Sequence, residues 1–242
     1  MDRRSFLNMG VAGLASSILA SPRSFAKSAN VKGSVMPLVK VELPSPKELL
    51  GGWAALAAVC AARGWGDVVY ATSSQWLYHD GGGNWACLRF NGKDKAVLVG
   101  HDHEYSETYF GEAAKYFEEV ETDLLKGAPK WWGFDLNPLP FGEWIGFVYG
   151  WDGEKWQRSN YNKPDGFESV GLLDACSTKN TELLKEFASD APGLNGKSPS
   201  EDSLVALVKA NGKISTSLLE SVVPGWNIGA GVAAASKFLE AG

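Results

Sequence analysis

The sequence predicts an α+β fold, in which one antiparallel sheet is built from two hairpins, is covered by helices and carries a helical C-terminal layer. Two pairs of short apolar segments are each joined by a turn, and helical periodicity precedes the first pair and dominates the last third. Strands and helices do not alternate one by one, as they do in parallel α/β folds. We place this fold in a single domain, residues 46–242, after a leader, residues 1–26, and a linker, residues 27–45.

The first expected helix begins at Pro46 and is ended by Gly64. Ser45 precedes the helix, and Glu48 follows Ser45 at the three-residue spacing of a capping box. Between these ends, apolar residues recur at helical intervals. Gly64 is able to take the left-handed conformation in which helices commonly end.

Two hairpins form the core of the predicted sheet. In the first, residues 85–90 and 96–99 are apolar runs joined by a glycine-containing turn. In the second, residues 144–149 and 155–158 flank a turn of the same kind. Two further short strands are expected at residues 68–71 and 75–78.

The other expected helices lie between the hairpins and in the last third of the chain. Residues 109–125 read as a helix whose apolar side includes Tyr116 and Phe117 and whose glutamates face solvent. Residues 168–188 are also helical by pattern, and a Gly/Pro/Ser-rich connection follows. Three shorter helices are expected at residues 201–210, 216–222 and 227–240.

The N-terminal residues have the features of an export signal. Arg3 and Arg4 precede an apolar run from Met9 to Ala20, which is about half as long as a membrane-spanning helix. Small residues at the positions read by a signal peptidase predict cleavage after Ala26. The segment resembles the twin-arginine class of signals, which are receptor-read addresses for folded proteins. We therefore expect a periplasmic or secreted protein without a stable membrane anchor after cleavage.

The charge balance excludes some classes of partner. The chain has 23 Lys and Arg against 28 Asp and Glu, a net charge of −5. Because the leader contains Arg3, Arg4 and Arg23 but only one acid, Asp2, its removal changes the net charge to −7. Nucleic acids and anionic membranes are bound by clusters of Lys and Arg. We therefore expect no nucleic-acid partner, whereas a basic protein partner is compatible with this charge.

The residues most suggestive of catalysis are His101, Asp102 and His103, directly after a predicted strand. If the strand continues, the two imidazoles lie on one face and Asp102 on the other. Two imidazoles are only part of a catalytic zinc site, which needs a third ligand, so we assign no metal and no cofactor. An exported hydrolase that uses these three residues is one alternative function. Because the chain has no G-x-S-x-G motif, and a polar turn is the simpler interpretation of the cluster, we favour a role without catalysis.

Aromatic residues are concentrated in the middle of the chain. Trp131 and Trp132 follow a Pro-Lys pair, and Trp151 lies at the tip of the second predicted hairpin, where burial is hard to arrange. Trp and Tyr in loops commonly anchor protein interfaces and stack on sugar rings. We therefore expect a recognition surface that contains Trp131, Trp132, Trp151, Tyr149 and Glu104. A carbohydrate-binding module for the cell wall, using surface Trp, is a second alternative function.

The three cysteines give little information about the fold. Cys60, Cys87 and Cys176 are an odd number, which does not make a closed disulfide framework. Cys60 lies in the first expected helix and Cys87 in a strand, so we expect both as small buried hydrophobic residues. Whether any two of the three form a disulfide is left open by the sequence.

A resemblance to a known family lies in residues 80–117. A turn with three glycines, residues 80–83, leads into a strand, a short turn and a second strand that ends at His101-Asp102-His103-Glu104, and a helix with Phe117 follows. This order is similar to the middle of proteins of the SUKH family, which includes many bacterial toxin-immunity proteins. The resemblance implies a single-domain α+β protein that neutralises a toxin by occluding it. With the export signal, it leads us to expect an immunity protein against a toxin or effector that acts in the cell envelope.

Overall fold

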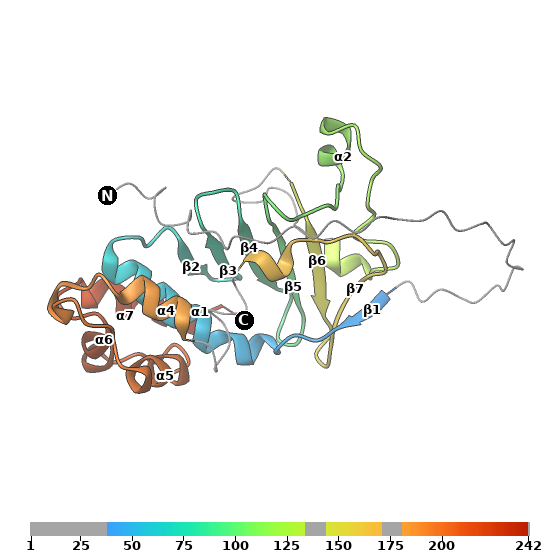
Figure 1. The fold of residues 1–242 in the computed structure, drawn as a ribbon. Helices are drawn as coiled ribbons and strands as arrows, with labels where there is room; N and C mark the ends of the chain where they lie inside the picture. Colours follow the sequence, from blue (N-terminus) through green and yellow to red (C-terminus); the bar gives the residue numbers. More distant parts are fainter. Residues whose placement is uncertain (1–37, 134–143, 171–180, 242) are drawn as a thin grey trace, which may run out of the picture. The chain divides into compact units, whose positions relative to one another are not determined.

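The computed structural model describes residues 38–133, 144–170 and 181–241. In this part of the chain seven strands form one sheet in the order β1-β7-β6-β5-β4-β3-β2, with antiparallel neighbours throughout (Figure 1). The strands are β1 (Leu38–Val41), β2 (Val69–Thr72), β3 (Gln75–His79), β4 (Trp85–Phe90), β5 (Ala96–His101), β6 (Phe147–Trp151) and β7 (Trp156–Ser159). Both predicted hairpins are present, as β4-β5 and β6-β7, and they pair with each other through β5 and β6. The α+β prediction is confirmed.

β1 lies inside residues 27–45, the range that the sequence analysis assigned to a linker. Leu38 pairs with Ser159 and Val41 pairs with Trp156, so β1 is the edge strand next to β7. The sheet therefore includes residues that precede residue 46, from Leu38 on. A four-residue strand whose partner lies far away in the sequence gives no local pairing signal, which is why the predicted boundary is too late.

The side chains of the central strands alternate between two hydrophobic cores. On β4, Ala86 and Leu88 face the core that contains the helices, which we call the helical core. Trp85 and Cys87 point to the opposite face, into a smaller second core. Because both faces of this strand are covered, the sequence reads as an apolar run from Trp85 to Leu88, followed by the buried Arg89, instead of an alternating pattern.

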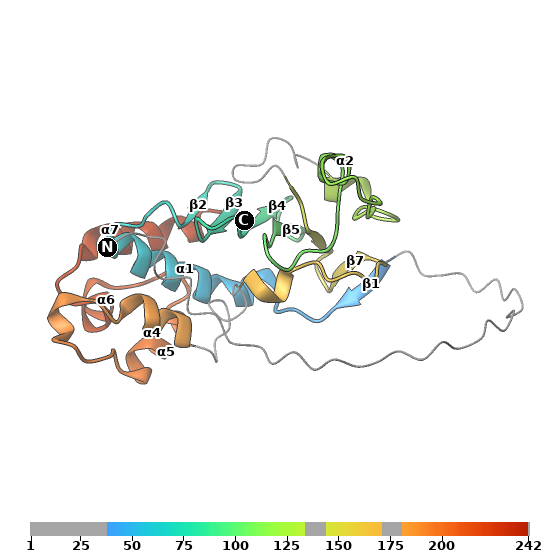
Figure 2. The ribbon, with the colours of Figure 1, turned by 45° about the horizontal axis from the view of Figure 1, so that its top comes forward.

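Most helices gather on one side of the sheet, whereas α2 stands apart from them in both views (Figures 1 and 2). The first helix has the predicted ends: the Ser45 N–H donates to Oε2 of Glu48 (2.8 Å), and Gly64 takes a left-handed conformation with φ 94°. α7 packs closely on α1, and a Cβ at Gly231 would overlap the carbonyl oxygen of Ala58. The helices are α1 (Pro46–Arg63), α2 (Glu112–Tyr116), α4 (Glu182–Ala188), α5 (Glu201–Lys209), α6 (Thr216–Val222) and α7 (Ile228–Ser236).

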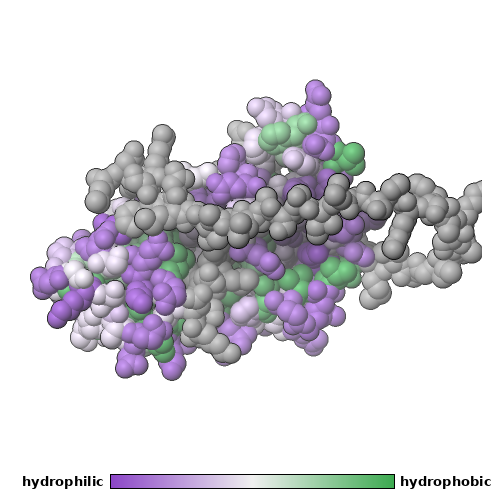
Figure 3. Space-filling view, viewed as in Figure 1, coloured by the Kyte–Doolittle hydropathy of each residue, from purple (hydrophilic) through white to green (hydrophobic). Residues whose placement is uncertain are grey.

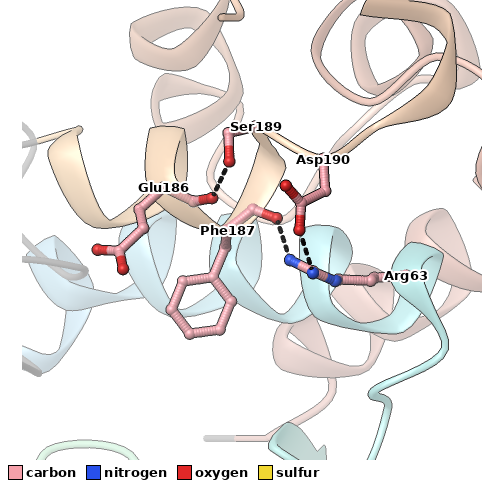
Figure 4. A network of polar contacts seen from close by, with 5 residues as sticks. All are labelled: Arg63, Glu186, Phe187, Ser189 and Asp190. Atoms are coloured by element: carbon pink, nitrogen blue, oxygen red, sulfur yellow. Dashed lines mark hydrogen bonds and ion pairs between the residues drawn. The ribbon is translucent and has the colours of Figure 1, made fainter. Parts of the chain in front are cut away.

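Arg63, at the end of α1, contacts α4 and the residues just after it (Figure 4). Its Nη1 donates to the carbonyl oxygen of Phe187 (3.0 Å), and its Nη2 forms an ion pair with Asp190 (2.5 Å). The guanidinium also stacks on Trp65, with 3.9 Å between its carbon and the ring centroid. These contacts help to hold the C-terminal helices as a layer on α1, as the sequence predicts.

Two predicted helices differ from those observed. The helix expected over residues 109–125 is reduced to the five residues of α2, and Glu118 just after it has a positive φ of 57° that no α-helix continues through. The helix expected over residues 168–188 begins in a 3₁₀ turn, Phe167–Val170, and ends with α4, while residues 171–180 lie outside the described residues. The predicted leader, residues 1–26, also lies outside them. No helix in the described part of the chain is long and apolar enough to cross a membrane.

Candidate functional site

Asp102 holds a turn together directly after β5. Its side chain is only 1% exposed. Oδ1 accepts the N–H groups of Glu104 (2.9 Å) and Tyr105 (2.7 Å), and Oδ2 accepts the hydroxyl of Ser169 (2.7 Å). A carboxylate whose oxygens accept three donors from a turn and a neighbouring loop is placed to organise the backbone, not to orient a histidine.

The two histidines of the cluster do not share a strand face, because β5 ends at His101. His103 lies in the turn, exposed to solvent, and its N–H donates to Oδ1 of Asn84 (2.7 Å). His101 is partly buried, and its ring packs edge-on against Trp144, with 6.1 Å between the centroids. Among the described residues, no three His, Cys, Asp or Glu side chains come together as a metal-binding group.

His101 gives the fold a dependence on pH. Burial lowers its pKa below the usual value, the charge of Asp102 opposes this shift and His103 adds to it, while Nδ1 finds no hydrogen-bond partner among the described residues. On acidification below about pH 6.5 the unfolded chain takes up the proton first, so the free energy of unfolding falls until the pH reaches the folded pKa.

We therefore expect His101→Asn to lose less stability than the parent protein between about pH 7.5 and about pH 5.5. Urea unfolding at the two pH values measures this difference. His103→Asn is the matched control, because His103 is exposed and makes only the last-ranked contribution to the pKa shift of His101, so it should stay close to the parent protein. Equal slopes for His101→Asn and the parent protein would show that His101 titrates normally in the folded state.

The predicted recognition surface is divided between the core and the surface. Trp132 is 1% exposed, in the 3₁₀ turn Lys130–Gly133, and its indole lies against Gly150 in the second core. Tyr149 is buried in the helical core. As surface anchors, these two residues are therefore wrong predictions. The chain after Pro129 folds back over the sheet, a tertiary contact that local sequence does not reveal.

The other three residues of that prediction remain accessible in different places. Trp151 is half-buried against Trp156, with 5.6 Å between the ring centroids. Trp131 is half-buried beneath the ammonium of Lys95, which lies 5.4 Å from the ring centroid. Glu104 is exposed on the turn that Asp102 organises. They do not contribute one continuous aromatic surface with Trp132 and Tyr149.

The exposed aromatic rings lie instead on the segment around α2. Tyr116 is 73% exposed and Phe117 is 44% exposed, although the sequence analysis placed both on the buried side of a helix. Phe117 packs against Trp144, with 4.7 Å between the ring centroids, and Tyr116 lies 5.4 Å from the same ring. We call residues 109–122 the aromatic protrusion, because α2 projects from the body of the molecule (Figure 1).

The aromatic protrusion is closed at its base and acidic on its surface. The N–H of Thr122 donates to the carbonyl oxygen of Tyr109 (2.7 Å), and the N–H of Gly111 donates to Oε1 of Glu121 (3.1 Å). Hydrophobic and hydrophilic residues lie side by side on it (Figure 3). Its four glutamates and one lysine give a net charge of −3. Three of these glutamates lie within residues 118–121, directly after Phe117. This acidic run is the feature of the sequence that argues against a buried helix face containing Tyr116 and Phe117.

A cleft of about 670 Å³ lies beside β1 and the loop of residues 163–169. Asp165 stands in it, and its Oδ2 accepts the hydroxyls of both Tyr149 (2.6 Å) and Tyr161 (2.7 Å). Burial, with the neighbouring charge of Asp165, raises the pKa of both tyrosines, so they stay protonated donors.

The cleft and the aromatic protrusion are joined through the turn of residues 102–107. The Ser106 hydroxyl donates to the carbonyl oxygen of Asp165 (2.7 Å), and the N–H of Glu107 donates to that of Pro164 (2.8 Å). Tyr105, which is 62% exposed, lines the cleft from the same turn. One short segment thus forms part of the cleft and leads into the protrusion.

No protein-family model, no curated protein and no solved structure matches this chain. Two features combine accessible groups with a defined geometry: the aromatic protrusion and the cleft.

Proposed function

We propose that this chain is an exported binding protein, an immunity protein that neutralises a basic toxin or effector in the cell envelope by inserting the aromatic protrusion into it. The observation that carries the proposal is the exposure of Tyr116 and Phe117 on a projecting, acidic segment. The exposure of large aromatic rings to water is unfavourable in free energy, and a partner surface that covers the rings removes this cost. Aromatic residues also contribute much of the binding free energy in protein interfaces.

The charge of the protrusion supports a basic partner. Glu112, Glu118, Glu119 and Glu121 surround the aromatic rings with a net charge of −3, and the whole chain is acidic too. Complementary charge accelerates the encounter with a basic surface and disfavours acidic ones. Occlusion of a toxin needs such a surface and no catalytic group.

The contacts around the predicted sites favour binding over the two alternatives. The oxygens of Asp102 accept hydrogen bonds from the turn and from Ser169, which weakens the hydrolase alternative. The burial of Trp132 removes one anchor from the sugar-binding alternative. The structure adds no further candidate residue to either the hydrolase or the carbohydrate-binding alternative within the described part of the chain.

The function is tested by co-expression with the product of the neighbouring gene, directed to the periplasm. We expect that product to stop growth alone, growth to be restored by this protein, and the two purified proteins to form a complex. The proposal is overturned if the neighbouring product is harmless, or if this protein neither restores growth nor binds it.

The double variant Tyr116→Ala, Phe117→Ala is expected to weaken that complex by about a hundredfold or more, since each truncated aromatic anchor costs about 2 kcal/mol. Leu239→Ala is the matched control, because Leu239 has the same 44% exposure as Phe117 and lies on the C-terminal 3₁₀ turn, Lys237–Leu239. Calorimetric titration measures both affinities, and urea unfolding confirms that the variants are folded. Equal losses of affinity in the double variant and in Leu239→Ala would show that the interface lies elsewhere.

Export is tested at the arginine pair. Replacement of Arg3 and Arg4 by lysine keeps the charge but removes the residues that a twin-arginine receptor reads, so the protein should stay in the cytoplasm at full length. Cell fractionation and the mass of the mature chain, expected to begin at Lys27, measure this. Undiminished export of the lysine variant would show that another route is used.

A further inference from the structure

The cleft beside β1 has an apolar wall. Val39 lies directly opposite Arg158 in the β1-β7 ladder, and Val41, two residues on, shares its face of the sheet. Leu43 lines the cleft beyond the end of β1, and Phe167 lines it from the loop of residues 163–169. A molecule in the cleft therefore meets aliphatic and aromatic carbon.

Arg158 brings a cation into this cleft in a fixed orientation. Its Nη1 donates to the carbonyl oxygens of Ser159 (3.1 Å) and Tyr161 (2.9 Å), and its guanidinium carbon lies 4.2 Å from the centroid of the Tyr161 ring. It forms no ion pair with a carboxylate within the described residues. The guanidinium also lies beside the Tyr161 hydroxyl. Because a guanidinium has five N–H donors, donors remain for an incoming planar anion, and carboxylates accept such donors in pairs.

The acidic groups of the cleft compete little for this cation. The oxygens of Asp165 already accept the hydroxyls of Tyr149 and Tyr161 and the N–H of Phe167 (3.2 Å). Glu42 is paired with Lys40 (2.6 Å). The lining also contains Lys163, which adds positive potential, and the exposed Glu168.

We propose that this cleft binds a small organic acid, whose carboxylate is held by Arg158 and whose apolar part lies against Val39, Leu43 and Phe167. A volume of about 670 Å³ is in the range of small-molecule sites, and this cleft combines one apolar wall with several fixed polar groups. The site lies outside the aromatic protrusion, so it is a second binding activity and stands or falls independently of toxin neutralisation.

The test uses the mature, folded protein with four probes: N-acetyl-leucine, hexanoate and the uncharged amide of each acid. We expect the two acids to bind in calorimetric or NMR titrations, and each amide to bind at least about tenfold more weakly, because it loses the charge-assisted hydrogen bonds. If neither acid binds at about 10 mM, or if acids and amides bind equally, the proposal is wrong.

Variants locate the site. Arg158→Gln should weaken binding of both acids by about tenfold or more, whereas Lys155→Gln, which removes a charge from the exposed turn between β6 and β7, should leave it unchanged. Val39→Phe fills the cleft while it leaves the charge of Arg158 in place, and it should also abolish binding. This second variant keeps the test decisive if Arg158→Gln unfolds. Full binding by Val39→Phe or by a folded Arg158→Gln protein overturns the assignment.

Discussion

Gly150→Ala is expected to lower the free energy of unfolding by about 3 kcal/mol, the upper part of the range for an overpacked core. Gly150 lies in β6, opposite Val97 of β5 and Gln157 of β7. A Cβ there would overlap the indole of Trp132, which is 1% exposed and packed in the second core. Because β6 lies between β5 and β7 and the indole is buried, the overlap is relieved only by a shift of packed groups.

The measurement is urea unfolding followed by tryptophan fluorescence. Gly66→Ala is the matched control, because a Cβ at Gly66 meets only ordinary contacts, at 3.8 Å or more. We expect Gly66→Ala to stay within about 0.5 kcal/mol of the parent protein. If Gly150→Ala did the same, the packing of Trp132 on β6 described above would be incorrect.

Asp102→Ala is expected to cost about 3 kcal/mol, because it leaves the N–H groups of Glu104 and Tyr105 without their buried acceptor and removes the contact between the turn and the Ser169 hydroxyl. Asp102→Asn should cost about 1 kcal/mol or less. The amide oxygen still accepts the two N–H groups, and the amide nitrogen donates to the Ser169 hydroxyl, which already donates to the carbonyl oxygen of Gly166.

The pair of variants separates the two properties of the Asp102 side chain that could stabilise the turn, its hydrogen-bond acceptors and its charge. Asn keeps an acceptor for the two N–H groups and removes the charge, whereas Ala removes both. Unfolding midpoints for the two variants, measured with Glu104→Ala as the exposed control, give the answer. A large loss of stability in Asp102→Asn would mean that the charge itself is required in the turn.

Features that depend on neighbouring residues were predictable from the sequence. The ends of α1 follow from Ser45, Glu48 and Gly64, which act within one turn of the helix. The β4-β5 hairpin follows from two apolar runs around a short turn. The burial of Cys60 and Cys87 was also expected, while Cys176 lies outside the described residues.

Features that depend on distant contacts were not predictable. β1 has no local partner, so its four residues read as linker until β7 is beside them. Trp132 reads as a loop anchor until the chain folds back onto Gly150. Tyr116 and Phe117 read as a buried helix face, because the sequence does not show that α2 has only five residues and projects into solvent.

The place of β1 in the sheet determines when this edge of the sheet can form during synthesis. Among the strands in the described residues, β1 is synthesised first, yet its ladder partner β7 is synthesised last. The pairing of β1 with β7 can therefore form only after the chain up to Ser159 has left the ribosome. A transporter that pulls the chain through from its N-terminus would separate β1 from β7 before it unfolds the rest of the sheet. This separation would remove Val39 and Val41 from the cleft. A transporter that accepts folded proteins would leave the pairing of β1 with β7 intact.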